Sequence, residues 1–333
     1  MDEKKSAAAF VDTLAVIGAG NTGASWAGLF AAHGYAVRLY DVKPGAAAAA
    51  LERAAAAARF LVVKGLAEPT PAERGIARLA TTESLEEAVA GVKLVQECVT
   101  DDVALKRRVF AAVSRAAPDD ALIATSSSGL SITEIQWDAR LPGRTLAAHP
   151  YNPPHIVPLV ELAPGESTDS STLEKAREFY LGVGKEPVLV SRDLPGYIAN
   201  RMSAALWREA IELVRSGVAT VEDVDKAICY GPGLRWAVMG PHLIYHLGGG
   251  KAGIRGHVSH LTATKEGMLR DLATWTSFPP DTGELLASGL EAEVGGKTLE
   301  ELGAERDEGL AAVVLALRRA RSPVQVQGQE QGT

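Results

Sequence analysis

A glycine-rich turn near the start of the chain most constrains what this sequence can fold into. The stretch VIGAGNTGASWAGLF, residues 16–30, carries Gly18, Gly20 and Gly23 at the spacing G-x-G-x-x-G, between an apolar run and a helical pattern. In such a turn the first glycine permits a tight bend and the second lets the backbone approach a pyrophosphate. The third allows the helix to pack closely on the strand.

The phosphates of a dinucleotide would lie on the N–H groups of Asn21 and Thr22, at the N-terminus of the helix. A second apolar run, AVRLYD, ends at Asp41, about 20 residues past the turn, where an acidic side chain holds the ribose hydroxyls. A carboxylate there also repels a 2′-phosphate, so the sequence favours NAD over NADP. The alternative is a glycine-rich turn followed by an ordinary surface aspartate.

Short apolar runs alternate with helical patterns through the first half of the chain. The runs that predict strands are TLAVIG, AVRLYD, KLVQECV, ALIATS, TLAAHP and VPLVELA, and stretches such as ALKRRVFAAVSRAA lie between them. This order predicts an α/β fold with a Rossmann-type, mostly parallel sheet covered by helices on both faces. After PVLVSRDLPG the pattern is helical.

Three segments follow from this change of pattern. We predict an NAD-binding Rossmann domain over residues 1–193 and a smaller all-helical domain, for substrate binding and dimerisation, over residues 194–320. The polar end of the chain, residues 321–333, has no periodicity and is expected to be disordered.

Composition excludes several classes of protein. The net charge of −7 argues against a nucleic acid or an anionic membrane as partner. Two cysteines do not make a disulfide framework and fit a reducing compartment. We find neither a signal peptide nor an apolar stretch of about 18 residues, and we predict no metal site. We therefore expect a cytoplasmic protein that acts on a small molecule.

A second informative stretch, AAHPYNPPHIVPLVEL, places a histidine and a carboxylate on neighbouring strands. His149 ends one strand and Glu161 lies in the next, so the carboxylate can hold the imidazole in one tautomer and raise its basicity. Ser128 and Asn200 could meet His149 at the carboxyl ends of the strands, where ligands bind in open α/β sheets. The alternative is a structural histidine satisfied by its neighbours.

Taken together, GAGNTG, ECVTDDVALK, TSSSGL, HPYNPP with PLVEL, and GYIANR resemble the 3-hydroxyacyl-CoA dehydrogenase family over roughly residues 12–260. The stretches QECV, HPYNPP and GPGLRW are most similar to the branch that includes L-gulonate 3-dehydrogenase (lambda-crystallin) and L-carnitine dehydrogenase, which act on free acids. The resemblance implies NAD-dependent oxidation of a 3-hydroxyl group by a homodimer.

The resemblance also implies roles for individual residues. His149 would be the catalytic base, Glu161 its orienting partner, and Ser128 and Asn200 would bond the substrate oxygen. The implied cofactor contacts are the glycine turn (Gly18, Gly20, Asn21, Thr22 and Gly23), Asp41, Asp101, Lys106 and Asn152. Without the resemblance, Asp101 and Lys106 read as a solvated charge run. Because the serine motif has the form SSSGL, either Ser127 or Ser128 could be the donor.

One segment of the helical half bears on the substrate. CoA-using members resemble one another at G-x-G-x-P-M-G-P, whereas this chain has GPGLRWAVMGP over residues 231–241. Arg235 is suited to bidentate binding of a carboxylate, and the alternative is a helix cap or a surface ion pair. Trp207, Trp236 and Tyr245 could pack against a quaternary ammonium group such as that of carnitine, or could simply be core.

Three functions from two classes therefore compete. The first is NAD-dependent oxidation of a free hydroxy acid resembling carnitine, gulonate or 3-hydroxybutyrate, with His149 as general base. The second is the same chemistry on a CoA thioester, and the third is a crystallin-like protein that binds NAD without catalysis. The intact set of Ser128, His149, Glu161 and Asn200 argues against the third. Helices such as MGPHLIYHL carry more apolar surface than so few helices can bury, which favours a homodimer formed through the second domain.

Overall fold

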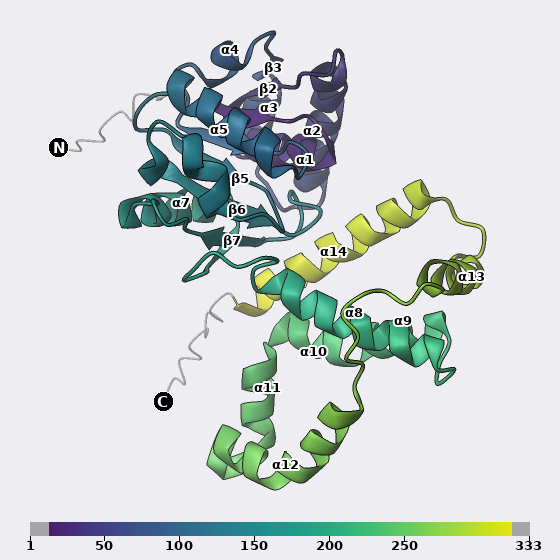
Figure 1. Ribbon diagram of the computed structural model, residues 1–333. Coiled ribbons are helices and arrows are strands. Elements are labelled where there is room, and N and C mark those ends of the chain that lie inside the picture. The colour runs from purple at the N-terminus through teal and green to yellow at the C-terminus, as the bar shows by residue number, and fades with distance from the viewer. Residues whose placement is uncertain (1–12, 322–333) are drawn as a thin grey trace, which may run out of the picture. The chain divides into compact units, whose positions relative to one another are not determined.

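The computed structural model describes residues 13–321 of the chain (Figure 1). Their contacts form two compact units: residues 13–200 with Arg306–Ala316, and Arg201–Glu305 with residues 317–321. The division predicted at residue 193 stays a prediction, and the first unit extends to Asn200 and includes part of the last helix. The tail expected over 321–333 lies, except for Arg321, outside the described residues.

Within residues 13–321, eight strands form one sheet in the order β3-β2-β1-β4-β5-β6-β7-β8. Neighbouring strands are parallel except β6 and β7, which are antiparallel. The strands are β1 (Thr13–Ile17), β2 (Ala36–Tyr40), β3 (Leu79–Thr81), β4 (Leu94–Glu97), β5 (Leu122–Thr125), β6 (Thr145–Pro150), β7 (Leu159–Ala163) and β8 (Glu186–Leu189). The predicted α/β fold is confirmed. The edge strand β3 was missed because it is only three residues long and lacks an apolar run.

Helices of the first unit cover both faces of the sheet. They are α1 (Asn21–Ala32), α2 (Ala46–Val63), α3 (Pro69–Ile76), α4 (Leu85–Val89), α5 (Val103–Ala116), α6 (Ile132–Ile135) and α7 (Ser170–Gly182), with short 3₁₀ turns at Gln136–Asp138 and Pro142–Arg144. Side chains alternate along each strand. In β1, Leu14 and Val16 therefore join a core cluster with Trp26 of α1, whereas Ala15 and Ile17 join the cluster that includes residues of α5.

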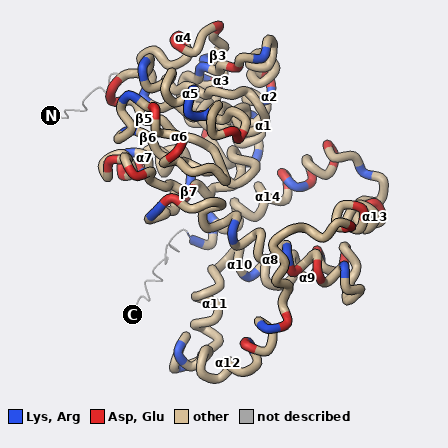
Figure 2. The backbone as a smooth tube through the Cα atoms, viewed as in Figure 1, with Lys and Arg blue, Asp and Glu red and all other residues tan. Residues whose placement is uncertain are grey.

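The described part of the second unit is helical, as predicted. Its elements are most of α8 (Ala199–Arg215), then α9 (Val221–Tyr230), α10 (Pro232–Val238), α11 (Pro241–Gly248), a 3₁₀ turn (Gly250–Ala252), α12 (Gly253–Asp271), α13 (Thr282–Val294) and parts of α14 (Leu299–Arg321). Figure 2 shows that α11 contains no lysine, arginine, aspartate or glutamate. None of the helices within residues 13–321 has the length and apolar character needed to cross a membrane.

Candidate active site

The glycine turn joins β1 to α1. Gly18 has a φ of +99°, and a Cβ atom there would lie 2.6 Å from the backbone C and O of Cys98, so only glycine fits. A Cβ on Gly20 would meet no atom of the described residues within 4 Å, which leaves open space above the turn. Gly20 is the N-cap of α1 and no described side chain caps this helix, so the N–H groups of Asn21 and Thr22 are available to an anion.

Asp41 follows β2 and lies against the same turn. Its Oδ2 accepts a hydrogen bond from the N–H of Ala19 at 2.7 Å, and its Oδ1 accepts one from the N–H of Lys43 at 2.8 Å. Each carboxylate oxygen keeps a lone pair for another donor, such as a ribose hydroxyl. The open turn, the uncapped helix and this carboxylate therefore fit NAD.

A pocket of about 200 Å³ opens at the carboxyl ends of β4, β5 and β6. Its lining includes several residues singled out in the sequence, namely Thr22, Asp101, Lys106, Ser128, His149 and Asn152. The other lining residues, which the sequence did not single out, are Cys98, Val99, Ser126 and Pro150. Polar groups from segments far apart in the chain thus converge at the edge of the sheet where open α/β folds bind ligands.

His149 and Glu161 lie directly opposite each other in the antiparallel pair β6–β7. Nδ1 of His149 is 2.9 Å from Oε2 of Glu161, and both side chains are buried. A carboxylate only accepts, so the neutral imidazole carries its proton on Nδ1. This tautomer leaves the lone pair on Nε2, the nitrogen to which a substrate proton could pass.

The second oxygen of Glu161 binds the start of α8. Oε1 accepts hydrogen bonds from the N–H groups of Ile198 and Ala199 at 2.8 and 2.9 Å. Burial raises the pKa of Glu161, but the hydrogen bonds from His149 and from these two N–H groups outweigh it, and the pKa lies below its usual value. Glu161 is therefore ionised at neutral pH.

Tyr197 shapes this turn, and the sequence did not single it out. Its φ of +45° is uncommon for a residue with a side chain. This backbone conformation precedes the N–H groups of Ile198 and Ala199, which point at Glu161. The buried ring of Tyr197 packs on His149, with the ring centroids 5.4 Å apart. The G-Y-I-A-N stretch was an available signal, because a glycine before a large aromatic residue indicates a constrained turn.

The remaining predicted donors occupy different positions around His149. Nδ2 of Asn200 lies 3.5 Å from Nε2 of His149, so the amide is at the edge of hydrogen-bonding distance from the ring. Ser128 lines the pocket, whereas Ser127 is buried and its Oγ accepts a hydrogen bond from the N–H of Leu130 at 3.3 Å. Of the two serines, the geometry favours Ser128.

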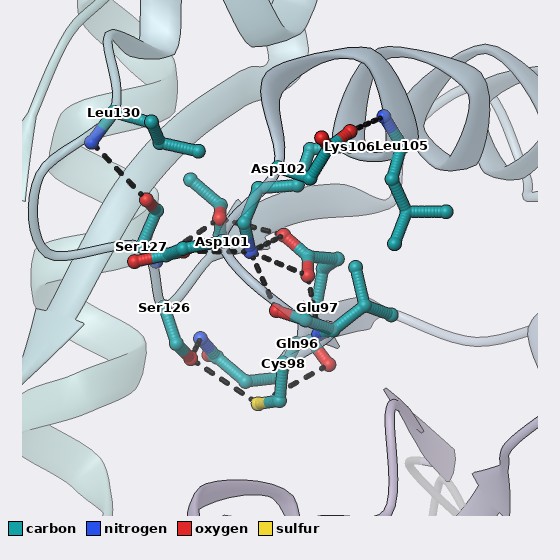
Figure 3. A network of polar contacts seen from close by, with 12 residues as sticks. Gln96, Glu97, Cys98, Asp101, Asp102, Leu105, Lys106, Ser126, Ser127 and Leu130 are labelled. Carbon is teal, nitrogen blue, oxygen red and sulfur yellow. Dashed lines mark hydrogen bonds and ion pairs between the residues drawn. The ribbon is translucent and has the colours of Figure 1, made fainter.

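Lys106 has a buried partner that the sequence did not single out (Figure 3). Its Nζ lies 2.8 and 3.0 Å from the two carboxylate oxygens of Glu97, 2.9 Å from the carbonyl oxygen of Val99 and 3.4 Å from Oδ1 of Asp101. Burial raises the pKa of Glu97, although Lys106 and the Thr125 hydroxyl act against it. Because these contacts use all three ammonium protons, Lys106 primarily fixes the loop that carries Asp101.

Ser126 and Cys98 form a second polar cluster beside the pocket (Figure 3). Oγ of Ser126 accepts hydrogen bonds from Nε2 of Gln96 at 2.8 Å and from Nε1 of Trp26 at 3.2 Å, and Sγ of Cys98 lies 3.2 Å away. Burial raises the pKa of Cys98 to about 12. The sulfur is therefore a thiol at neutral pH and not a nucleophile.

The loop between β6 and β7, which carries Asn152, is tied to α1. Oγ of Ser25 accepts a hydrogen bond from the N–H of His155 at 2.9 Å and lies 2.8 Å from its Nδ1. Burial lowers the pKa of His155 to about 4, so its ring is neutral at physiological pH.

A buried lysine holds the same loop from the other side. Nζ of Lys185 donates to the carbonyl oxygens of Pro154 and Val157, both at 2.7 Å, and lies 4.8 Å from the centroid of the Trp26 ring. Burial lowers the pKa of Lys185 to about 7. The loop that presents Asn152 therefore rests on a buried lysine amine that donates to two of its carbonyl oxygens.

The second unit holds the residues expected to recognise the substrate. Arg235 is exposed on α10, and it makes no ion pair with any residue from 13 to 321. The three aromatic residues are not core, because Trp207, Trp236 and Tyr245 are 51%, 38% and 37% exposed.

Both halves of the chain match models of one family. Residues 13–194 match the NAD binding domain of 3-hydroxyacyl-CoA dehydrogenase, and residues 196–285 match its C-terminal domain.

Similar proteins extend over nearly the whole chain. An L-carnitine dehydrogenase of Streptomyces griseus is 39% identical over 314 residues, which is 93% of this chain and 91% of the relative. One of Pseudomonas aeruginosa is 38% identical over 94% of this chain and 96% of its own. Among solved structures, the NAD⁺-dependent 5-formyl-3-hydroxy-2-methylpyridine 4-carboxylic acid 5-dehydrogenase is 29% identical, with a TM-score of 0.79 over 92% of this chain and 99% of that one. The 3-hydroxybutyryl-CoA dehydrogenase of Escherichia coli is 33% identical, with a TM-score of 0.61 over 71% of this chain and 49% of that one.

Proposed function

Because the chain belongs to the 3-hydroxyacyl-CoA dehydrogenase family and is an NAD-dependent dehydrogenase that acts on CH–OH groups, we propose that it oxidises the 3-hydroxyl of a free hydroxy acid. L-Carnitine is the first candidate substrate, since similar proteins of full length carry that activity in their names. The observation that carries the chemistry is the buried His149–Glu161 pair beside the pocket.

His149 acts as the general base. Its Nδ1 proton is held by Glu161, so Nε2 accepts the proton of the substrate hydroxyl. The imidazolium that forms is stabilised by the Glu161 carboxylate, which its low pKa keeps ionised. NAD, when bound, supplies the acceptor for the hydride that leaves the carbinol carbon. The hydroxyl thereby becomes a ketone, and the proton stays on His149 until solvent removes it.

Ser128 and Asn200 direct the substrate oxygen toward His149. The hydroxyl and the amide N–H donate to this oxygen, and they continue to donate as it becomes a carbonyl oxygen. Asn152, held by the tied loop, completes the wall of the pocket near the reacting carbon. These donors place the hydroxyl proton toward Nε2 of His149, as general base catalysis requires.

The adenosine half of NAD is held by the glycine turn and Asp41. The uncapped N–H groups of Asn21 and Thr22 would bind the diphosphate, and the Asp41 carboxylate would accept the ribose hydroxyls. Asp101 lines the pocket and would contact the cofactor, and Lys106, which also lines the pocket, would act by fixing Asp101.

Arg235 distinguishes free acids from CoA thioesters in this proposal. It replaces the proline turn that CoA-using members share, and its guanidinium pairs with a carboxylate in a fork. Its exposure, and its freedom from ion pairs with the rest of residues 13–321, leave its N–H groups available to a substrate.

We also propose that the second unit forms a homodimer. The unit buries few large apolar side chains of its own, among them Ile211, Val221 and Val224, while Leu243 and Leu247 on α11 are 52% and 62% exposed. A helix with exposed leucines and no lysine, arginine, aspartate or glutamate is typical of a surface that pairs with a second protein surface.

The test is a panel of substrates assayed through the formation of NADH. The panel contains L-carnitine, D-carnitine, L-gulonate, 3-hydroxybutyrate and sulfonate analogues, with acetoacetyl-CoA assayed in the reverse direction. We expect the highest kcat/KM on a free acid, with L-carnitine well above D-carnitine. Efficient turnover of acetoacetyl-CoA alone would instead support the thioester reaction, and NADH binding without turnover of any compound would support a crystallin-like role.

A further inference from the structure

Two oppositely charged side chains hold one residue of the glycine turn. The N–H of Ala19 donates to Oδ2 of Asp41 at 2.7 Å, and the carbonyl oxygen of Ala19 accepts a hydrogen bond from Nη2 of Arg53, also at 2.7 Å. Arg53 lies in α2, 34 residues farther along the chain than Ala19. The sequence did not indicate this contact, which brings a guanidinium to the same residue as the carboxylate.

The guanidinium of Arg53 keeps most of its hydrogen-bonding capacity. It has five N–H donors and no acceptor, and the contact with Ala19 uses only one donor. The side chain is exposed, and no carboxylate within residues 13–321 forms an ion pair with it. A cation in this state can pair with an anion brought by a ligand.

We propose that Arg53 is a residue of cofactor specificity that can bind a phosphate on the ribose 2′-oxygen, and that Asp41 opposes this binding by repelling the phosphate. A guanidinium pairs with phosphate through a fork of hydrogen bonds, whereas the Asp41 carboxylate, bound to the N–H of the same residue, repels a phosphate. Selectivity for NAD over NADP then depends on two opposing interactions with the 2′-phosphate, repulsion by Asp41 and attraction by Arg53, rather than on Asp41 alone. This inference rests on the proposed placement of the ribose at Asp41.

The test measures binding rather than turnover. Dissociation constants are determined by calorimetry for 5′-AMP and 2′,5′-ADP, which differ only in the 2′-phosphate, and by fluorescence for NADH and NADPH. The variants are Asp41→Ser, Arg53→Met and the double variant. Arg59→Met is the matched control, because it removes an exposed arginine from the same helix, away from the glycine turn.

In the Asp41→Ser variant we expect binding of 2′,5′-ADP to tighten by about 10- to 100-fold, the range of one or two hydrogen bonds to a charged group. Adding Arg53→Met should remove this gain and change the binding of 5′-AMP little. Adding Arg59→Met should leave the gain in place. In the native protein, Arg53→Met should weaken NADPH more than NADH.

Arg53 also supports the glycine turn through its hydrogen bond to Ala19. A second substitution therefore distinguishes the effect of its charge on a phosphate from the effect of this hydrogen bond. Arg53→Gln keeps an N–H donor for the Ala19 carbonyl and loses the charge. When added to Asp41→Ser, it should remove the gain in 2′,5′-ADP affinity, as Arg53→Met does. A gain of 2′,5′-ADP binding that survives in both double variants would overturn the proposal. So would an equal loss of 5′-AMP and 2′,5′-ADP, because Arg53 would then act only on the turn or on the diphosphate.

The same measurements separate this inference from the proposed cofactor site. If Asp41→Ser changed the affinity of no nucleotide, the ribose would not lie at Asp41, and both statements would fail together. If Asp41→Ser behaved as expected and the Arg53 variants had no effect, only the inference about Arg53 would fail.

Discussion

The two units differ in where their side chains find partners. In the first unit, two pairs of ionisable groups at the pocket are buried and satisfied internally, namely Glu161–His149 and Lys106–Glu97. In the second unit, large apolar side chains such as Leu247 remain exposed. The chemistry of the first unit can therefore be derived from contacts within that unit. The exposed apolar side chains of the second unit need a ligand or another chain as their partner.

Free energy explains why this difference matters. Burial of an exposed leucine contributes about 1.5–3 kcal/mol, so a few leucines on α11 could stabilise an association. Burial of an ionised group costs free energy unless it is paired, so the pairs of the first unit constrain its geometry strongly.

The largest expected effect comes from breaking the pair in the first unit. His149→Ala removes the base, and we expect turnover to fall by about 10²- to 10⁴-fold while NADH binding stays nearly intact. Glu161→Gln should act similarly, because an amide that keeps its oxygen on Ile198 and Ala199 presents N–H to Nδ1 and enforces the other tautomer. The checks are kcat and fluorescence titration with NADH. Near-native turnover in both variants would refute the mechanism.

A smaller effect tests whether the second unit selects the substrate. Arg235→Met should raise KM for the preferred acid by about 10- to 100-fold, since a hydrogen bond to a charged group is lost, while NADH binding is unchanged. Arg235→Lys should recover only part of the loss, because an ammonium cannot form the fork. Arg255→Met removes an exposed arginine from α12 of the same unit and serves as control. If Arg235→Met kept its full kcat/KM on the free acid, the thioester reaction would be favoured instead.

The exposed leucines give the third prediction. Sedimentation should show a particle of twice the chain mass of 35.0 kDa. Leu247→Asp should shift it to the monomer, since a charge on α11 opposes burial of that surface. Val42→Asp, at an exposed apolar residue of the first unit, should leave the mass unchanged. A native protein that sediments only as a monomer would contradict the proposal.

The smallest effect concerns the buried lysine of the first unit. The lowered pKa of Lys185, about 7, means that the folded state binds fewer protons than the unfolded state from pH 7 to about 10. The free energy of unfolding should therefore rise with pH in this window, by at most about 1.4 kcal/mol per pH unit. Lys185→Met should flatten the rise measured by denaturant titration, and Lys93→Met, at an exposed lysine, should not. An unchanged slope in Lys185→Met would show that another group titrates.

Contacts at the carboxyl ends of the strands were predictable, and contacts that depend on how helices pack were not. The glycine spacing indicated a cradle because φ and close approach dictate glycine at Gly18, and the His149–Glu161 pair followed from two adjacent strands. Arg53 on Ala19 and His155 on Ser25, which is 130 residues away, depend on how helices pack on the sheet, and no local pattern encodes that packing. The sequence did not single out Lys185, because its burial is visible only in the folded chain.

The antiparallel pairing of β6 with β7 also has a consequence for engineering this site. The parallel strands are joined by long crossovers, but His149 and Glu161 are brought together by one loop and lie only 12 residues apart in the chain. Side chains alternate between the faces of a strand, so removal of one residue from β7 before Glu161 would turn its carboxylate to the other face, while removal of two would keep it. Changes of even length in β7 are therefore expected to keep the side chains of His149 and Glu161 facing each other. The loop between β6 and β7 can then be varied to alter substrate choice while this pair stays in place.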